Sequence, residues 1–306
     1  MHRYSALPLV LGLLLILQAG NSPIHLMQSQ TVVHNIAEVE LSIELTWFTD
    51  SEVEGLATDG EYFYISTAET VFGNGDAWLY KLYPNGTYID EVLVRDGTLN
   101  HCGGMVFYDG LLWIPLSERG FVPNNPSKIV RYDTDLLFID EWINSSSIGN
   151  VNWGGICILP LLERVYIGNY GTSNLYVYDL DKNRLNDIRP PPSENIQDYV
   201  EVNGVIYCSK PGASLDAIHV WEAADSYGNS LRSIGVMETD GASSGLTWFD
   251  GAFWTCVGSG AATLYKLGGS VTTVPIENGD GLLLVTALVS VLCLALGIAV
   301  YSKIRK

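Results

Sequence analysis

Basic residues are scarce in this 306-residue chain, which has 16 lysines and arginines against 34 aspartates and glutamates. A protein that binds nucleic acid needs a basic surface to neutralise phosphates, so this composition excludes nucleic acid as an expected partner. The G-x-S-x-G, Walker-type and H-E-x-x-H patterns are also absent from the sequence. No common nucleophile, phosphate-binding or zinc-protease motif therefore indicates a reaction.

Cysteine is also infrequent, with five residues in the chain, four of which precede the C-terminal apolar segment: Cys102, Cys157, Cys208 and Cys256. Four cysteines permit three pairings. A chain of this length builds a core without disulfides, so we expect buried free thiols. His101 and Cys102 are neighbours in the sequence, but adjacent strand residues point to opposite faces. We therefore do not expect a Cys–His nucleophile here.

The two ends of the chain are apolar. Residues 6–17 form an apolar run after Arg3, and small residues follow at 19–22. This pattern is typical of a secretory signal peptide, which we assign to residues 1–22. The alternative, an N-terminal membrane helix, is disfavoured because the run is too short to span a bilayer.

The C-terminal segment differs in length. Residues 281–300 carry no charge, and twenty helical residues cover about 30 Å, one bilayer core. The basic residues Lys303, Arg305 and Lys306 follow, which predicts a transmembrane helix at 281–301 and a cytoplasmic tail at 302–306. A removable lipid-anchor signal is the alternative, but such signals normally end apolar. We expect a single-pass protein of the cell membrane with an extracellular ectodomain.

The predicted ectodomain is strongly acidic, with 12 basic and 34 acidic residues between the two apolar ends, a net charge of −22. This charge favours solubility and would attract cations or basic ligands. Residues 269–280 are polar and short, so we expect a stalk that connects a folded domain at 37–268 to the membrane.

A short pattern recurs through the ectodomain. A glycine precedes an apolar run at Gly55, Gly104, Gly155 and Gly245, with Asp198 in the equivalent place of the fourth copy, and the mean spacing is 47.5 residues. An aromatic residue follows each of these positions: Tyr64, Trp113, Tyr166, Tyr207 and Trp254. Each copy continues with an alternating strand, a polar turn and another strand, which is the sequence signature of a β-propeller blade.

The last copy ends after its third strand. Residues 38–47 ("EVELSIELTW") alternate apolar and polar as an outer strand does, so we predict that they complete the last blade and close the ring. The sequence thus predicts an all-β, five-bladed β-propeller over residues 37–268. An all-β sandwich is the alternative, and the regular period disfavours it.

Polar residues just before the repeated glycines should meet around the axis at one end of the propeller, which we call the top. These include Glu54, His101, Asn152 and Asn195. Carboxylate and amide oxygens suit calcium, and an added histidine suits zinc, so this ring is a candidate metal site. The alternative is a water-filled channel lined with polar residues.

Two long segments, 67–77 and 116–127, should lie on neighbouring blades at the top. They carry aromatic and charged residues that are candidate ligand contacts: Glu69, Phe72, Asp76, Glu118, Arg119, Phe121 and Asn124. Such a combination is typical of a recognition surface. Alternatively, the two phenylalanines pack back onto the blades.

Three segments resemble known propeller families. Residues 164–185 ("RVYIGNYGTSNLYVYDLDKNRL") resemble the YVTN repeat of microbial surface-layer propellers. Residues 54–66 ("EGLATDGEYFYIS") resemble the opening of gluconolactonase/regucalcin-like propellers, which implies Glu54 as a metal ligand. "SEVEGLATDG" at residues 51–60 is similar to five-bladed glutamine cyclotransferases, which implies an acidic residue, again Glu54, in a central pocket.

These observations lead to three hypotheses of function. The first is a membrane-anchored extracellular propeller that binds a protein or small-molecule ligand on its top face. The second is an enzyme of the central channel, either a metal-assisted lactonase-like or esterase-like hydrolase or a glutamine cyclotransferase, in which Glu54 and His101 are the catalytic residues. The third is a structural surface-layer component.

Overall fold

The computed structural model describes residues 30–32, 38–48, 51–69, 76–119, 125–149, 151–170, 172, 174–189, 195–211, 216–239, 244–268 and 273–275. The predicted signal peptide and transmembrane helix lie outside these residues. Within the described part of the chain, no helix has the length and apolar character needed to cross a membrane. The chain divides into two units, residues 32–273 and the two ends 1–31 and 274–306, and the sheets below belong to the first.

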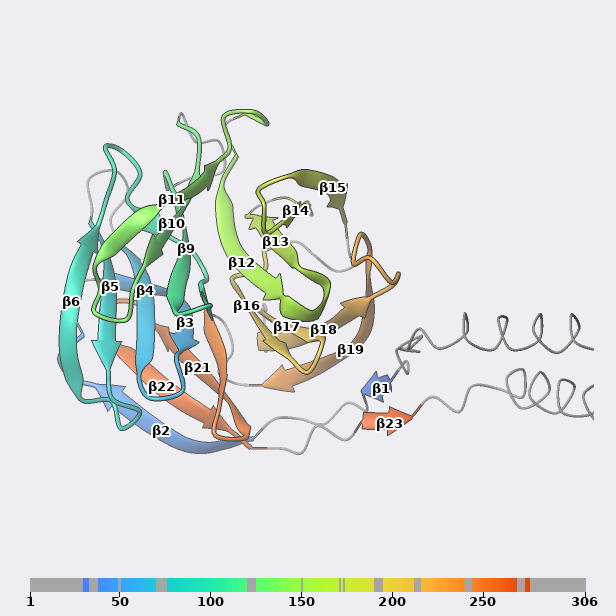
Figure 1. The fold of residues 1–306 in the computed structure, drawn as a ribbon. Coiled ribbons are helices and arrows are strands. Elements are labelled where there is room, and N and C mark those ends of the chain that lie inside the picture. Colours follow the sequence, from blue (N-terminus) through green and yellow to red (C-terminus); the bar gives the residue numbers. More distant parts are fainter. Residues whose placement is uncertain are drawn as a thin grey trace, which may run out of the picture. The chain divides into compact units, whose positions relative to one another are not determined.

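The unit 32–273 is built from antiparallel strands in groups of four (Figure 1). Sheet 1 contains β3 (Ser51–Thr58), β4 (Phe63–Glu69), β5 (Ala77–Leu82) and β6 (Tyr88–Val94). Sheet 2 contains β7 (His101–Cys102), β8 (Val106–Tyr108), β9 (Leu111–Ser117), β10 (Lys128–Tyr132) and β11 (Phe138–Asn144). Sheet 3 contains β12 (Trp153–Leu159), β13 (Arg164–Asn169), β14 (Leu175–Asp179) and β15 (Arg184–Ile188), with a 3₁₀ turn, η1 (Pro160–Leu162), after β12.

Sheet 4 contains β16 (Asp198–Val202), β17 (Val205–Lys210), β18 (Asp216–Ala223) and β19 (Leu231–Thr239). Sheet 5 contains β20 (Gly245–Phe249), β21 (Ala252–Gly258), β22 (Ala262–Leu267) and β2 (Val39–Leu45). The prediction that an N-terminal strand completes the last sheet is therefore confirmed, because β2 pairs with β22 from Val39–Leu267 to Leu45–Ala262.

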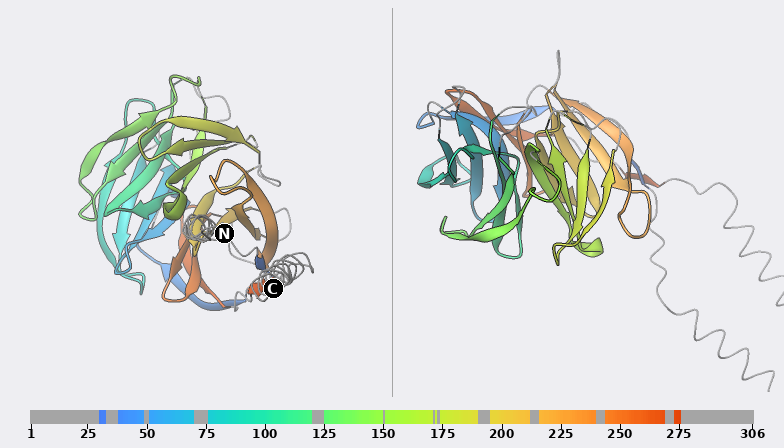
Figure 2. Two further views of the ribbon diagram at one scale, coloured as in Figure 1. Left: turned by 45° about the vertical axis from the view of Figure 1, so that its right-hand side comes forward. Right: turned by 90° about the horizontal axis from the view of Figure 1, so that it is seen from above.

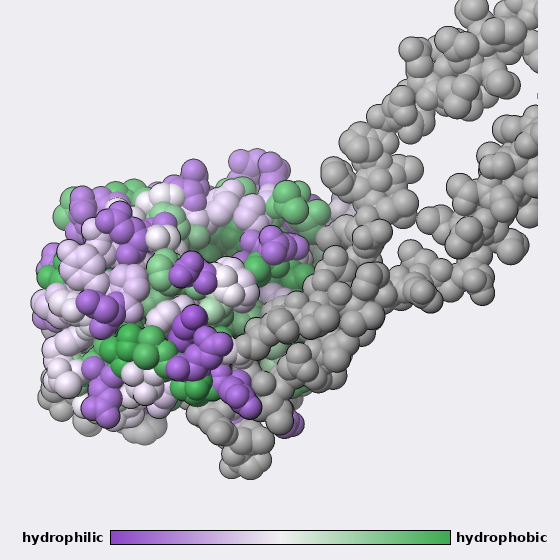
Figure 3. Space-filling model, turned by 90° about the horizontal axis from the view of Figure 1, so that it is seen from below, coloured by the Kyte–Doolittle hydropathy of each residue, from purple (hydrophilic) through white to green (hydrophobic). Residues whose placement is uncertain are grey.

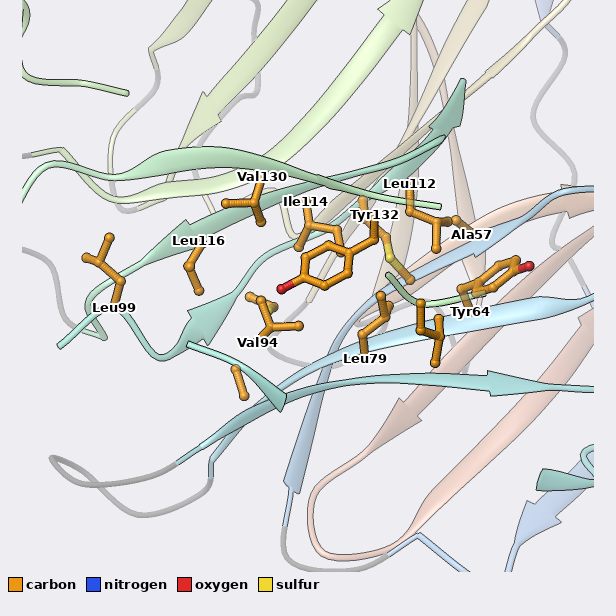
Figure 4. Packing of buried hydrophobic residues seen from close by; sticks show 14 residues of the cluster. Ala57, Tyr64, Leu79, Val94, Leu99, Leu112, Ile114, Leu116, Val130 and Tyr132 are labelled. Atoms are coloured by element: carbon orange, nitrogen blue, oxygen red, sulfur yellow. The ribbon is translucent and has the colours of Figure 1, made fainter. Parts of the chain in front are cut away.

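The sheets lie around a common centre (Figure 2). The first strands of successive sheets contact one another in a closed cycle, from β3 to β8, β12, β16, β20 and back to β3. A hydrophobic layer fills the space between each pair of neighbouring sheets. Figure 4 shows the layer between sheets 1 and 2, where Tyr64, Leu79 and Val94 pack towards Leu112, Ile114 and Val130. The aromatic residues of the repeat are all buried in such layers: Tyr64, Trp113, Tyr166, Tyr207 and Trp254.

One sheet differs from the others. The first strand of sheet 2 is interrupted between β7 and β8, whereas the first strands of the other sheets are continuous. Within the interruption, Gly104 forms a parallel bridge with Gly155 of sheet 3. On the other side, His101 of β7 pairs with Ala68 of β4, so sheets 1 and 2 form one continuous nine-stranded sheet.

The ring has two distinguishable ends. Ser51, at the start of β3, accepts a hydrogen bond from the Gly260 N–H (2.9 Å) at the predicted top end. The chain enters and leaves at the other end, where the Gly268 N–H donates to the Glu38 carbonyl (2.7 Å). Part of the predicted stalk is also ordered into a strand, because β23 (Thr273–Pro275) pairs with β1 (Gln30–Val32) in a two-stranded sheet.

Candidate functional site

The strand β3 and the segment 101–105 approach each other at the top end of the axis. A Cβ atom on Gly55 would lie 2.8 Å from the Gly104 Cα and 2.9 Å from the Met105 N, closer than two such atoms pack. Glycine at position 55 therefore permits the two backbones to touch. This contact, together with the His101–Ala68 pairing, brings the side chain of His101 beside that of Glu54.

Glu54 and His101 form a buried pair. The His101 Nε2 lies 3.2 Å from the Glu54 Oε1, and the two residues are 9% and 4% exposed, respectively. A carboxylate at Nε2 favours the tautomer that carries its proton there, which leaves a lone pair on Nδ1. The His101 Nδ1 is buried and has no hydrogen-bond partner among the described residues. The pair thus combines a carboxylate, a polarised N–H and an unused acceptor.

A second pair lies at the rim. The Arg119 Nη2 donates to the Glu52 Oε2 (2.5 Å) and joins the end of β9 to β3. Tyr170, which follows β13, is half-buried, and its burial raises the pKa of its hydroxyl. The negative charges of Glu54 and Glu52 raise this pKa further, while Arg119 opposes them. The phenol therefore lies within electrostatic reach of both carboxylates.

Asn152 completes this group of polar residues. The Ser117 hydroxyl donates to the Asn152 Oδ1 (2.7 Å), and both residues are 1% exposed. The Tyr170 N–H donates to the Asn152 carbonyl (2.8 Å), so Asn152 also fixes the start of the segment that carries the phenol. We call the residues described so far the axial cluster: Glu52, Glu54, His101, Ser117, Arg119, Asn152 and Tyr170.

First strands of different sheets pack closely against one another on the axis beneath the axial cluster. A Cβ on Gly104 would lie 2.3 Å from the Gln197 carbonyl oxygen and 2.4 Å from the Asp198 Oδ1. A Cβ on Gly155 would lie 2.6 Å from the ring of Tyr199. The first strands of neighbouring sheets are thus in close contact at the repeated glycines. A ligand of the axial cluster would therefore enter from the top.

The predicted ring of metal ligands forms only in part. Glu54 and His101 come together, and Asn152 lies nearby through Ser117. Asn195 is exposed in a left-handed conformation (φ 59°), and no described hydrogen bond joins it to the other three. In the described part of the chain, no group of three or more His, Cys, Asp or Glu side chains could hold a metal. Zinc usually takes three or four such ligands, so the described residues bring together only part of a zinc site.

The predicted loop surface is described only in part. Phe72, Phe121 and Asn124 lie outside the described residues, and Glu69 is described by its backbone alone. Asp76 forms an ion pair with Arg95 (2.8 Å) that is nearly half exposed. Glu118 accepts a hydrogen bond from the Asn125 N–H (3.3 Å). Arg119 is also predicted as part of this loop surface, but its hydrogen bond to Glu52 places it in the axial cluster.

The four cysteines are buried free thiols, as predicted: Cys102, Cys157, Cys208 and Cys256. Burial raises the pKa of the Cys102 thiol far above its ordinary value, and the Glu54 charge adds to this effect. Cys102 packs in the hydrophobic layer between sheets 1 and 2 while His101 reaches Glu54. The thiol is thus unreactive and separated from the histidine, as the alternation of strand residues predicts.

Glu52, Ser117, Tyr170 and Asp198 of this region were not predicted as site residues. Ser117 ends β9 and Tyr170 follows β13, and no repeated sequence feature marks either residue. Asp198 has a clear signal, because it stands where the other copies have glycine. Only the structure shows that its carboxylate lies on the axis.

Comparison with known proteins gives a family but no activity. A family model described as "Family of unknown function (DUF6454)" matches residues 18–188. No curated protein matches the sequence. The solved structure of a glutaminyl cyclase from Myxococcus xanthus is similar with a TM-score of 0.57 and 14% identity, over 79% of this chain and 99% of that chain.

A GH43_1 enzyme from Xanthomonas citri matches with a TM-score of 0.46 and 11% identity, over 78% of this chain and 96% of that chain. At these identities, the likeness to the glutaminyl cyclase supports the fold alone. Together with the four-stranded sheets, it shows an all-β, propeller-like architecture.

Proposed function

This chain belongs to the DUF6454 family, whose function is unknown, and we propose that it is a membrane-anchored extracellular β-propeller that binds a small polar ligand at the top end of its axis. The cell-membrane location follows from the predicted signal peptide and C-terminal helix. We expect the top end to face away from the membrane, because the chain enters and leaves the ring at the opposite end.

Five blades are the arrangement that the sheet contacts support. The first strands of the five sheets form a closed cycle of contacts, and five hydrophobic layers separate the sheets in the described residues. The pairing of β2 with β22 leaves sheet 5 with four strands, like the others. A ring closed in this way positions residues of three sheets at one end of the axis.

The observation that carries the proposal is the burial of the Glu54–His101 pair at this end. Burying a carboxylate has a large cost in free energy unless the group is paired. Here one imidazole nitrogen pairs with the carboxylate and the other has no partner among the described residues. A polar ligand with an N–H or O–H group would supply the missing hydrogen bond and reach Tyr170 and Glu52 at the rim.

Thermal unfolding of the full-length protein in lipid nanodiscs tests this proposal. An amino acid amide, a glutaminyl dipeptide and a sugar lactone serve as probes, since a ligand that binds the folded state raises Tm by mass action. We expect at least one probe to raise Tm of the wild type. Glu54→Gln should weaken that binding about tenfold or more, because a hydrogen bond to a charged group contributes about 1.5–3 kcal/mol.

The matched control is Glu91→Gln, which makes the same substitution at an exposed position of β6, away from the axial cluster. We expect it to leave the probe affinities unchanged. A probe that binds the wild type and the Glu54→Gln variant equally would contradict the proposal, because the buried carboxylate would then contribute nothing to binding.

A second candidate function is acid–base catalysis in the same site, favoured by the 3.2 Å contact between the carboxylate and the imidazole. The similar fold of a glutaminyl cyclase suggests one reaction. The α-amine of an N-terminal glutamine attacks its own side-chain amide, Glu54 accepts the amine proton, and the proton then leaves with ammonia.

Mass spectrometry of a glutaminyl peptide would detect the loss of ammonia. We expect the wild type to release it faster than the uncatalysed reaction and Glu54→Gln to show only the uncatalysed rate. Equal rates with wild type, with the variant and without protein would refute this candidate and leave the binding proposal intact.

A further inference from the structure

Asp198 is a buried carboxylate on the axis that the proposed ligand site does not use. It is the first residue of β16 and is fully buried. It stands where the other copies of the repeat have glycine. A buried carboxylate must be held by hydrogen bonds or charges, so its partners indicate why it is there.

The partners are backbone N–H groups from several sheets. The Asp198 Oδ2 accepts from the Leu56 N–H of β3 (2.8 Å) and from the Leu246 N–H of β20 (2.9 Å). The Oδ1 accepts from the Tyr199 N–H (2.8 Å), and the carboxylate also accepts from the Met105 N–H. Burial raises the pKa of Asp198, and these N–H donors oppose that effect. One side chain thus joins the first strands of sheets 1, 2, 4 and 5.

Two of these donors belong to the segments that carry the Glu54–His101 pair. Leu56 is two residues after Glu54 on β3, and Met105 is four residues after His101. Both N–H groups converge on one carboxylate, which fixes the distance between their backbones. The same segments touch at Gly55 and Gly104, and Gly104 also packs against the Asp198 Oδ1. The carboxylate therefore lies directly beneath the pair and contacts both of its supports.

We propose that Asp198 is a positioning residue, whose carboxylate clamps β3 and the segment 101–105 so that the Glu54 and His101 side chains stay in contact. The proposal rests on the axial cluster being the ligand site, since only then does the contact have a function. It also explains why one copy of the repeat departs from glycine. The Asp198 carboxylate holds the first strands together, whereas the other copies have glycine at this position and contribute only backbone.

The test measures the Glu54–His101 contact directly. In full-length protein labelled with ¹⁵N-histidine, the exchange rate of the His101 Nε2–H with water reports how firmly Glu54 holds it. Asp198→Asn keeps the side-chain shape but places an NH₂ group among N–H donors. We expect the exchange to become at least about tenfold faster, because the clamp no longer opposes local opening.

The matched control is Ile218→Val in β18, which removes one buried methylene from sheet 4. Such a change leaves a small cavity in the core without touching either segment. We expect His101 exchange to stay within about twofold of wild type in this control. A folded Asp198→Asn variant with unchanged exchange, or equal acceleration in the control, would overturn the proposal.

If Asp198→Asn does not fold, Ser209→Ala provides a milder change. The Ser209 hydroxyl accepts a hydrogen bond from the Asp198 N–H (3.0 Å) and donates to the Ser244 carbonyl (2.5 Å). Its loss should accelerate His101 exchange less than Asp198→Asn but in the same direction, and unchanged exchange would count against the clamp. The measurement needs no ligand, so it separates failure of the clamp from failure of the binding function.

Discussion

The space available for a side chain determines which residues stand on the axis of this molecule, as much as their chemistry does. Gly104 has no room for a Cβ because the Gln197 carbonyl and the Asp198 carboxylate lie within 2.4 Å of where it would be. The repeat of glycines is readable in the sequence, and its period predicts the sheets. The sequence does not reveal that glycine marks the contact between first strands, because a strand glycine also occurs at bulges and bends.

A buried histidine away from the axial cluster gives a prediction of pH dependence. His219 in β18 is 6% exposed, and burial, with a smaller effect of Lys210, lowers its pKa to about 4. In the unfolded chain the pKa is about 6.5, so the unfolded state binds more protons between these two values. The stability due to the neutral imidazole is therefore complete above about pH 6.5 and is lost as the pH falls towards 4.

We expect the free energy of unfolding to fall by no more than about 3 kcal/mol from this residue over that range, since one pKa unit corresponds to about 1.4 kcal/mol. Urea unfolding at pH 7 and pH 4.5 checks this in the wild type and in His219→Gln. The variant should lose less stability on acidification. Equal losses in the two proteins would show that His219 is not the titrating group.

The residues of the candidate site could be predicted only where the repeat marks them. Glu54 stands one residue before its glycine, His101 and Asn152 stand three residues before theirs, and the structure places all three in the axial cluster. Asn195 also stands three residues before the repeat position, Asp198, but it lies exposed in a left-handed conformation. Arg119 joins the cluster through a contact with Glu52 across 67 residues of sequence, which no local pattern encodes.

At the level of elements, the strand β2, which completes sheet 5, shows how far the alternation of apolar and polar residues predicts the burial of side chains. Leu41, Ile43 and Leu45 lie on one face, and burial increases along the strand from Leu41, which is 45% exposed, to Leu45, which is 2% exposed. Leu45 packs in the layer between sheets 5 and 1, with Leu56 and Phe63. Leu45 therefore contributes to the hydrophobic core, whereas Leu41 remains largely exposed.

This difference predicts unequal effects of two similar substitutions. Leu45→Ala should destabilise the protein by about 2–5 kcal/mol, because it leaves a cavity in the core. Leu41→Ala, in the same strand, should change stability by no more than about 0.5 kcal/mol. Chemical denaturation of both variants measures these values. Similar effects of the two substitutions would mean that β2 does not complete sheet 5 as described.

The interruption between β7 and β8 could not be read from the sequence. Residues 103–116 ("GGMVFYDGLLWIPL") have the pattern of a continuous hairpin. The chain leaves the strand pattern because the Gly104 N–H donates to the Gly154 carbonyl (2.8 Å) and the Ile156 N–H donates to the Gly104 carbonyl (3.2 Å). Such a contact depends on a neighbouring sheet some fifty residues away in sequence, and hydrophobic alternation contains no information about it.

At the scale of the whole molecule, the two main features are the acidic net charge and the predicted attachment to the membrane. The surface seen from below mixes hydrophilic and hydrophobic residues (Figure 3). This mixture is ordinary for a soluble domain, whose surface is normally about half apolar. The acidic charge of the predicted ectodomain favours solubility in a domain that we propose is presented outside the cell.

The membrane attachment gives a prediction for the full chain. Expressed in its entirety, the protein should sediment with membranes, and a truncation after residue 270 should appear in the soluble extracellular fraction. The physical reason is the uncharged segment 281–300, whose length matches about 30 Å of hydrocarbon. Substituting Leu283 and Leu284 with lysine provides a full-length control that should also lose membrane attachment. A soluble full-length protein, or a truncated form that still sediments, would contradict this topology.

The central claim is that the Glu54–His101 pair receives a ligand at the top of the axis, and its most direct test uses two histidines of the same domain. The imidazole NMR signals of His101 and His219 are followed while full-length protein is titrated with whichever probe raises its Tm. We predict that the His101 signals shift and saturate while those of the buried His219 in sheet 4 stay constant. Saturable binding with unchanged His101 signals would contradict the account.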